Sequence, residues 1–341
     1  MHVTTLRLWP VAVLFLGDFI ARGASTIYVD HRRGNDRRDG VSATVDGYHT
    51  GPVRTVQSAL RRVAMGGRIV ILPVSEPYTE SFVVEGKRRL GSARRPLTID
   101  GGGQEWVGWR PIPDEWTHRR GELFRLDRPT KTFTRLYQAG KPIAMSLDDP
   151  DQASGTLLAG QAARHETLLF FAGKNLRMPA EEDLWATSLP GGVVFDGASH
   201  VVLQNFIFRG YRIDAIQVRG VCRDITIKAC EIHHSGRGGI YVGSCADVAV
   251  TQVSMSDLPK AGILAEDRAR VRLRGVTTDG VANRISMGED VVVDDDGKPA
   301  DPRKTPSTSP TLLPPTEPLA EPDAPEIPSD LPLRPTPGRH R

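Results

Sequence analysis

The stretch that decides the fold runs from residue 200 to 287 and repeats one pattern four times. Its copies open with HVVLQNFIF (200–208), DITIKACEI (224–232), DVAVTQVSM (247–255) and RVRLRGVTT (270–278). Val201, Ile225, Val248 and Val271 hold the same place in the four copies, at intervals of 24, 23 and 23 residues. A short, regular period made of alternating apolar residues indicates one coil of a solenoid per copy.

Each copy contains three strand-like pieces with an apolar residue at alternate positions: V-x-L, then a pair such as Cys230-x-Ile232, then G-I-x-V. Such alternation predicts strands with one buried face, and no helical pattern separates them. The Leu-x-x-Leu-x-Leu run of a leucine-rich repeat does not occur. The sequence therefore predicts an all-β protein whose residues 190–290 form a single-stranded parallel β-helix.

The N-terminal part carries four further motifs in order: IYVDHRRGNDRRDG (27–40), GPVRTVQSAL (51–60), GRIVILPVSEPYTESFVV (67–84) and PLTIDGGG (96–103). With the repeats, they resemble the right-handed parallel β-helix repeat proteins of the pectate-lyase-like superfamily, many of which are secreted and act on polysaccharides. The resemblance covers residues 26–103 and 190–290. The motifs are specific for the fold, but they indicate the activity only weakly.

A short helix is expected after Thr55, whose hydroxyl can cap it. Val56, Ala59, Leu60 and Val63 form its apolar face, and Gly66-Gly67 follows its end. A solenoid needs a cover over the open end of its core. We therefore expect residues 25–103 to hold this capping helix and the first coils.

The rest of the chain divides into three further parts. Residues 1–24 resemble a signal peptide, with Arg7, an apolar run and the small-residue site Ala21-Arg22-Gly23. Asp18 interrupts the apolar run, so an uncleaved N-terminal anchor is the alternative, and export is favoured. Residues 104–189 are expected to form a β-rich insertion, whose tryptophans 106, 109, 116 and 185 suit either its own core or stacking on sugars. Residues 291–341 are expected to form a disordered Pro-rich tail.

The charge composition indicates which classes of binding partner to expect. The net charge is only +3 and both signs are interspersed, so a clustered basic surface for nucleic acid is not expected. No membrane span is expected in the mature chain. We expect a secreted or periplasmic monomer whose partner is a polysaccharide.

The three cysteines are Cys222, Cys230 and Cys245. Cys230 falls on an inward position between Phe206 and Val253, which predicts an inert core thiol. Cys222 and Cys245 fall at nearly the same place in successive coils. Coils lie about 4.8 Å apart and bridged Cα atoms roughly 4.4–6.8 Å apart, so a Cys222–Cys245 disulfide and two free thiols are both compatible with the sequence.

Candidate site residues gather in the loops between the second and third pieces of each coil. The repeat alignment places Arg209, His233, Ser256 and Asp279 in one column, and His234 and Asp257 in the next. Arg237 lies over Lys260, and Tyr241 points outward between Ile240 and Val242. We assign Lys260, Arg237, His233, His234 and Asp257 as candidate catalytic residues, and Tyr241, Arg209 and Asp279 as candidate substrate-binding residues.

Two function classes fit this cluster. One is an enzyme: a lyase would use Lys260 as base, its pKa lowered by Arg237, or a histidine oriented by Asp257, whereas a hydrolase would use Asp257 and Asp279 as paired carboxylates. The other is a non-catalytic β-helix that binds glycan or a surface partner along its flat side. Exposed solenoid loops carry many charges regardless of function.

No cofactor is required by either class, although two acidic groups suit Ca²⁺. They are Asp294-Asp295-Asp296 and the set Asp30, Asn35, Asp36 and Asp39. For the first group we favour a solvated turn. For the second we favour hydrogen bonds that form turns and caps.

Overall fold

The structure is a computed structural model that describes residues 25–87, 90–112, 116–127, 135–138, 141–146, 157, 161–165, 168–173, 183–296 and 298–299. The expected signal peptide and nearly all of the expected tail lie outside these residues. Within them, no helix is long and apolar enough to cross a bilayer.

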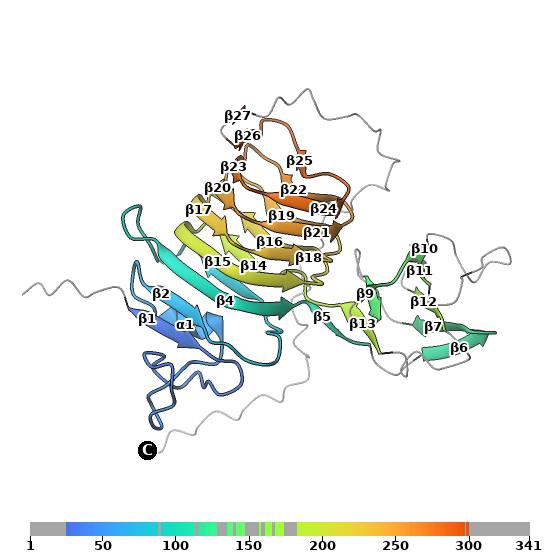
Figure 1. Cartoon of the computed structure of the whole chain (residues 1–341), viewed down its shortest axis with the longest axis horizontal. Coiled ribbons are helices and arrows are strands. Elements are labelled where there is room, and N and C mark those ends of the chain that lie inside the picture. The colour runs from blue at the N-terminus through green and yellow to red at the C-terminus, as the bar shows by residue number, and fades with distance from the viewer. Residues whose placement is uncertain are drawn as a thin grey trace, which may run out of the picture. The chain divides into compact units, whose positions relative to one another are not determined.

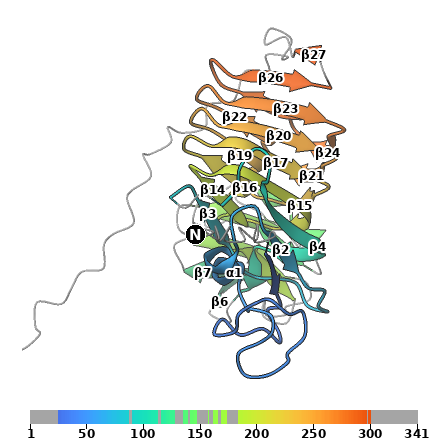
Figure 2. The same cartoon turned by 90° about the vertical axis from the view of Figure 1, so that its left-hand side faces the viewer.

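Three sheet faces wind around one core, so the predicted parallel β-helix is confirmed (Figures 1 and 2). The first face contains β1 (Thr26–Val29), β2 (Arg68–Ile71), the start of β4 (Leu97–Val107), the start of β15 (Ser199–Arg209), β17 (Arg223–Lys228), β20 (Asp247–Thr251), β23 (Arg270–Arg274) and β26 (Val292–Asp295). Neighbouring strands of this face are parallel. The short strand β27 (Lys298–Pro299) then pairs antiparallel with β26.

The second face contains the ends of β4 and β15, then β18 (Glu231–His233), β21 (Ser254–Leu258) and β24 (Thr277–Val281). The third face contains β3 (Phe82–Glu85), β14 (Val193–Asp196), β16 (Asp214–Arg219), β19 (Gly238–Val242), β22 (Ala261–Ala265) and β25 (Ile285–Met287). The predicted register is confirmed: Val201 pairs with Ile225, Ile225 with Val248, and Val248 with Val271.

Columns of left-handed residues mark where the chain turns between faces. Between the first and second faces, Asn205, Ala229, Gln252 and Gly275 have φ values of 59°, 49°, 53° and 59°. At the end of the second face, Gly210, His234, Asp257 and Gly280 have φ values of 65°, 60°, 53° and 58°. A left-handed φ costs a non-glycine residue roughly 1–2 kcal/mol. Hydrogen bonds between coils, such as His234 N–H to Ser256 O, offset that cost.

Aromatic and aliphatic side chains fill the interior. Cys230 is buried among them, and burial raises the pKa of its thiol to about 12, as expected of an inert core cysteine. Trp106 is wholly buried in the same core and stacks on Tyr78 with ring centroids 4.7 Å apart. Strand β4, which carries Trp106, pairs with β15 as far as Val107. The β-helix therefore includes residues 104–107. The expected start of the insertion at residue 104 is wrong, because these four residues belong to the β-helix.

The capping helix is confirmed as α1 (Val56–Arg62). The Thr55 hydroxyl accepts a hydrogen bond from Ser58 N–H, and the four predicted apolar residues of the helix are buried in the main core. The helix lies against β1, β2 and β3 at the start of the solenoid (Figure 2). It thus covers the core end that the first coil leaves open.

The insertion leaves the solenoid after Gly108 and returns at Ser188, whose N–H donates to Gly108 O. It has its own small core, which includes Trp116 and Phe171. One of its sheets contains β10 (Met145–Ser146), β11 (Ala162–His165), β12 (Leu168–Ala172), β7 (Leu123–Asp127) and β6 (Trp116–Arg120). The other contains β5 (Trp109–Pro111), β13 (Leu184–Thr187), β8 (Leu136–Gln138) and β9 (Lys141–Pro142).

The repeats also extend further than expected. Strand β26 pairs with β23 through Val271 and Val293, and Val293 is buried. The expected tail boundary at residue 291 is therefore wrong for residues 292–295. Asp295 forms an ion pair with Arg284, and Asp296 accepts a hydrogen bond from Gly275 N–H. These two acidic side chains act as structural partners at the end of the last coil.

The N-terminal acidic group has the expected turn role. Asp30 is wholly buried and accepts hydrogen bonds from Arg32 N–H and Arg33 N–H. Asp36 accepts bonds from Arg54 N–H and from both Thr55 N–H and its hydroxyl, which connects this loop to the capping helix. Among the described residues, no three His, Cys, Asp or Glu side chains gather closely enough to hold a metal ion.

Candidate functional site

The predicted column on the second face is confirmed. Arg209 pairs with His233, His233 with Ser256, and Ser256 with Asp279 on successive parallel strands. Arg209 forms an ion pair with Glu105, and Asp279 is exposed. The next residues along the chain are the left-handed ones: His234 begins the turn that leaves this face, whereas Asp257 still lies within β21, which ends at Leu258.

His233 bridges two polar side chains. Its Nδ1 lies 2.7 Å from Ser256 Oγ, and its Nε2 lies 3.4 Å from Glu231 Oε2. The His233 side chain is 19% exposed, whereas that of Glu231 is 53% exposed. Because Glu231 and His233 lie two residues apart on β18, both side chains point to the same side of the strand. The result is a Ser–His–Glu chain across two coils.

His234 lies at the boundary between the solenoid and the insertion. Its Nδ1 is 3.2 Å from Asp257 Oδ2, close enough for an ion pair but without hydrogen-bond alignment. The Tyr137 hydroxyl donates to His234 O, and Arg135 Nη1 donates to Asp257 O at 3.0 Å. Burial lowers the pKa of His234, while Asp257 acts against that shift.

A second cluster lies on the third face around Arg237. Its Nε donates to Asp214 Oδ1 at 3.1 Å and its Nη2 donates to Asp214 Oδ2 at 2.5 Å. The Asp214 side chain is wholly buried, and that of Arg237 is 24% exposed. Burial raises the pKa of Asp214, and the bonds from Arg237 oppose this shift. The guanidinium also lies 5.1 Å from the centroid of the Tyr241 ring.

Tyr241 points outward from the third face, as predicted, between the buried residues Ile240 and Val242. Burial and the nearby carboxylates of Glu266 and Asp267 raise its pKa. Gln217 precedes it and Leu264 follows it in the same outward column. The third face therefore offers a half-buried tyrosine beside a fixed guanidinium.

The residues that the sequence grouped as one site separate into these two clusters. The charges acting on His234 come from Asp257, His233, Arg135 and Arg209, whereas those acting on Arg237 come from Asp214, Glu266 and Tyr241. Lys260 donates its backbone N–H to Arg237 O, which confirms the stacking of the two residues. Its side chain is exposed. Because Asp214 compensates the Arg237 charge, Arg237 and Lys260 are not an isolated pair of like charges.

Asp214 was not predicted from the sequence. In the repeat it shares a column with Gly238 and Ala261, and a lone acid among small residues is a usable signal. Tyr137 and Arg135 were also missed, because no repeat aligns the insertion with the coils.

The Cys222–Cys245 disulfide is not present in this structure. All three thiols are free, with Cys222 buried and Cys245 exposed. Arg223 N–H bonds to Ala198 O, Asp247 N–H to Cys222 O, and Arg270 N–H to Ala246 O. Cys222 therefore stacks on Ala246 rather than on Cys245. Left-handed Asp224 adds one residue to its coil and shifts the alignment by one.

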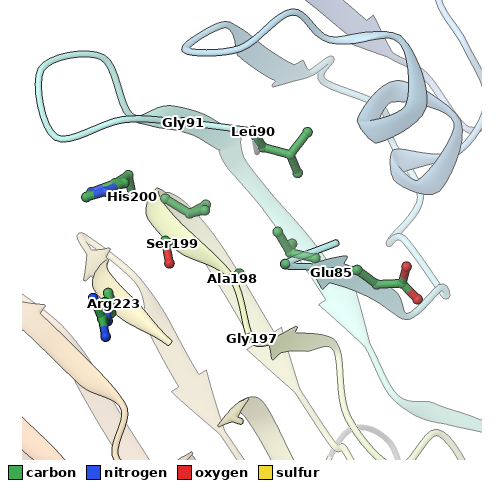
Figure 3. A pocket seen from close by; sticks show the side chains of 11 residues that line it. Glu85, Leu90, Gly91, Gly197, Ala198, Ser199, His200 and Arg223 are labelled. Carbon is green, nitrogen blue, oxygen red and sulfur yellow. The ribbon is translucent and has the colours of Figure 1, made fainter. Parts of the chain in front are cut away.

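A cavity of about 230 Å³ lies elsewhere, at the corner where the third face passes to the first (Figure 3). Glu85, Leu90, Ser199, His200 and Arg223 contribute to its lining. The His200 ring lies 2.9 Å from Asp224 Oδ2. None of the residues assigned from the sequence lines this cavity.

The two clusters suit different chemistry. The second face has a histidine in contact with a hydroxyl and a carboxylate, which is an arrangement for proton transfer. The third face has an aromatic surface and a planar cation, which is an arrangement for binding. The Asp214 carboxylate is inaccessible and serves to hold Arg237.

The solved structures to which this chain is similar share little sequence with it. One similar solved structure is XylC in complex with xylose, at 12% identity and a TM-score of 0.46, where the match covers 79% of this chain and 64% of that one. Another is a glycoside hydrolase, at 9% identity and a TM-score of 0.41, covering 80% of this chain and 96% of that one. No curated protein matches the chain. Residues 191–295 match the family model of the right-handed beta helix region, which makes this part of the chain a right-handed parallel β-helix.

Proposed function

We propose that this protein binds an acidic polysaccharide on the third face of its β-helix, at Tyr241 and Arg237. The observation that carries the proposal is the Arg237 guanidinium, fixed by a buried carboxylate and held 5.1 Å from an outward-facing tyrosine ring. The geometry favours the binding function over a lyase, because Asp214 fixes the Arg237 guanidinium in place, whereas the side chain of Lys260, the candidate lyase base, is exposed.

A buried acid beside an arginine pre-orients the cation before any ligand arrives. Two of the guanidinium nitrogens, Nε and Nη2, donate to Asp214, which leaves Nη1 for a ligand. A planar guanidinium recognises carboxylate or sulfate groups well. Because the Arg237 side chain is still 24% exposed, a ligand on the third face can reach it.

Tyr241 would supply the contact with the sugar ring. A half-exposed aromatic ring combines apolar area with little loss of side-chain entropy on binding. The parallel strands hold Gln217 on one side of it and Leu264 on the other. An acidic sugar can thus stack on Tyr241 while its anionic group meets Arg237.

The experiment is a glycan-array screen of the protein, followed by affinity measurement on the acidic glycans that bind. Tyr241→Ala should weaken binding roughly three- to tenfold, because an aromatic contact contributes about 0.5–1.5 kcal/mol. Tyr48→Ala is the matched control, since Tyr48 is a 73% exposed tyrosine in the N-terminal loop. Absence of binding to every acidic glycan, or equal affinity of Tyr241→Ala and the parent protein, would refute the proposal.

Export is part of this proposal and is supported by the sequence of residues 1–24, with its apolar run and small-residue site. Mass spectrometry of the protein recovered outside the cytoplasm should show an N-terminus close to Gly23. A chain that retains residues 1–24 in the cytoplasm would contradict export without affecting the glycan-binding test.

A further inference from the structure

The Ser–His–Glu chain on the second face has no part in the proposed glycan binding. Ser256 lies on β21, and His233 and Glu231 lie on the neighbouring strand β18. Backbone pairing between Glu231 and Ser254, and between His233 and Ser256, fixes the register of the two strands. The two side-chain contacts of His233 are therefore held by the sheet itself.

One tautomer of the neutral imidazole, with its proton on Nε2, satisfies both side-chain contacts of His233. A carboxylate only accepts, so Nε2–H of a neutral His233 donates to Glu231, at 3.4 Å. Nδ1 then has a free lone pair, and the Ser256 hydroxyl donates to it at 2.7 Å. A hydroxyl that donates to a histidine, oriented in turn by a carboxylate, is an activated nucleophile in the general sense.

The surroundings favour a reactive site at this corner. The His233 side chain is 19% exposed, so it is largely shielded from solvent but still accessible. Left-handed Asp257 follows Ser256 directly, with φ of 53°, one residue before β21 ends at Leu258. Arg135 of the insertion donates to Asp257 O, and Tyr137 donates to His234 O. The insertion thus borders the corner next to Ser256.

We propose that Ser256 is the nucleophile of an esterase site for carboxylic esters of alcohols, with His233 as general base and acid and Glu231 as a positioning residue. Ser256 Oγ would attack the ester carbonyl carbon while His233 Nδ1 takes the hydroxyl proton. The bond from the carbonyl carbon to the alkoxy oxygen then breaks, and His233 returns the proton to the leaving alcohol. An acyl-Ser256 intermediate remains.

Water completes the cycle. His233 takes a proton from water, the resulting hydroxide attacks the acyl carbon, and the carboxylic acid leaves as Ser256 Oγ recovers the proton. The net reaction is ester plus water to acid plus alcohol, and it needs no cofactor. Glu231 accepts a hydrogen bond from Nε2–H throughout and keeps Nδ1 directed at Ser256.

The test uses p-nitrophenyl acetate hydrolysis and labelling by a fluorophosphonate, with peptide mapping of the labelled residue. Labelling should map to Ser256, and Ser256→Ala should abolish it and lower hydrolysis at least a hundredfold. Ser254→Ala is the matched control, because Ser254 lies on the same side of β21 but pairs with Glu231 rather than with His233. That variant should retain labelling and hydrolysis.

Glu231 is tested by its own variants. Glu231→Gln should lower kcat roughly tenfold with little change in KM, and Glu231→Asp should restore part of the loss. Circular dichroism and thermal melting confirm that each variant is folded. The proposal is overturned if the parent protein neither hydrolyses the ester nor takes the label, or if the label maps to another residue. It stands or falls separately from glycan binding, which depends on the third face.

Discussion

Arg237 forms two hydrogen bonds to Asp214, a carboxylate that has no solvent exposure at all. Breaking a buried pair by removing one charge leaves the other uncompensated and costs about 3–5 kcal/mol. Arg237 also contacts the Tyr241 ring. The ion pair therefore supports both the stability of the third face and the proposed binding surface.

We predict that Asp214→Asn lowers the free energy of unfolding by about 3 kcal/mol, because it leaves Arg237 without its buried partner. Urea denaturation of the parent and the variant measures the difference. Asp196→Asn is the control, since Asp196 forms only an exposed ion pair with Arg219 at 3.9 Å, and such pairs contribute less than about 1 kcal/mol. Equal stability of the two variants would show that the buried pair has no special role.

Gly210 of the solenoid packs closely against the start of the insertion. Its φ is +65°, and a Cβ at this position would lie 2.1 Å from Cε3 of Trp109, the first residue of β5. We predict that Gly210→Ala destabilises the protein and displaces Trp109, which tryptophan fluorescence would detect. Gly103→Ala isolates the backbone strain, because Gly103 has φ of +69° and a Cβ added there would meet nothing within 4 Å. The Gly103 variant should lose roughly 1–2 kcal/mol, and the Gly210 variant more.

The thiols should react in two classes. Cys245 is exposed, whereas Cys222 and Cys230 are buried, and burial raises the pKa of both buried thiols. Because the thiolate is the reactive form, a thiol reagent should modify Cys245 rapidly in the folded protein and the other two only after unfolding. Cys245→Ser should remove the fast phase. Loss of reaction at Cys245 without reductant, restored by reductant, would instead indicate the disulfide.

The repeat made most of the solenoid predictable. The four-copy alignment placed Cys230 in the core and His233 beside Ser256, because parallel strands in register convert sequence spacing directly into contacts. The alignment wrongly placed Cys222 beside Cys245, because one coil carries an extra residue. Left-handed Asp224 is that residue, and Cys222 therefore stacks on Ala246. The alignment also could not find Asp214 as the partner of Arg237, since that contact depends on side-chain direction at a turn.

Glu80 should make stability depend on pH near neutrality. Burial, aided by the Asp36 charge, raises its pKa to about 7, although Val56 N–H donates to its Oε1 at 3.2 Å. The folded state thus holds the proton more tightly than the unfolded state, whose carboxyl has the ordinary pKa of 4.5. The stabilisation is complete below that value and is lost as pH rises toward 7. At 1.36 kcal/mol per pKa unit, the loss is about 3 kcal/mol at most.

Glu80→Gln should remove this dependence, because the amide has no proton to lose and its oxygen can still accept from Val56 N–H. Urea denaturation at pH 5 and pH 8 should then show a smaller decrease in stability for the variant than for the parent. Glu76→Gln is the matched control, since Glu76 is 54% exposed in its ion pair with Arg32 and should leave the dependence unchanged. If Glu80→Gln and the parent lose equal stability between these pH values, another group causes the pH dependence. The prediction for Glu80 is then wrong.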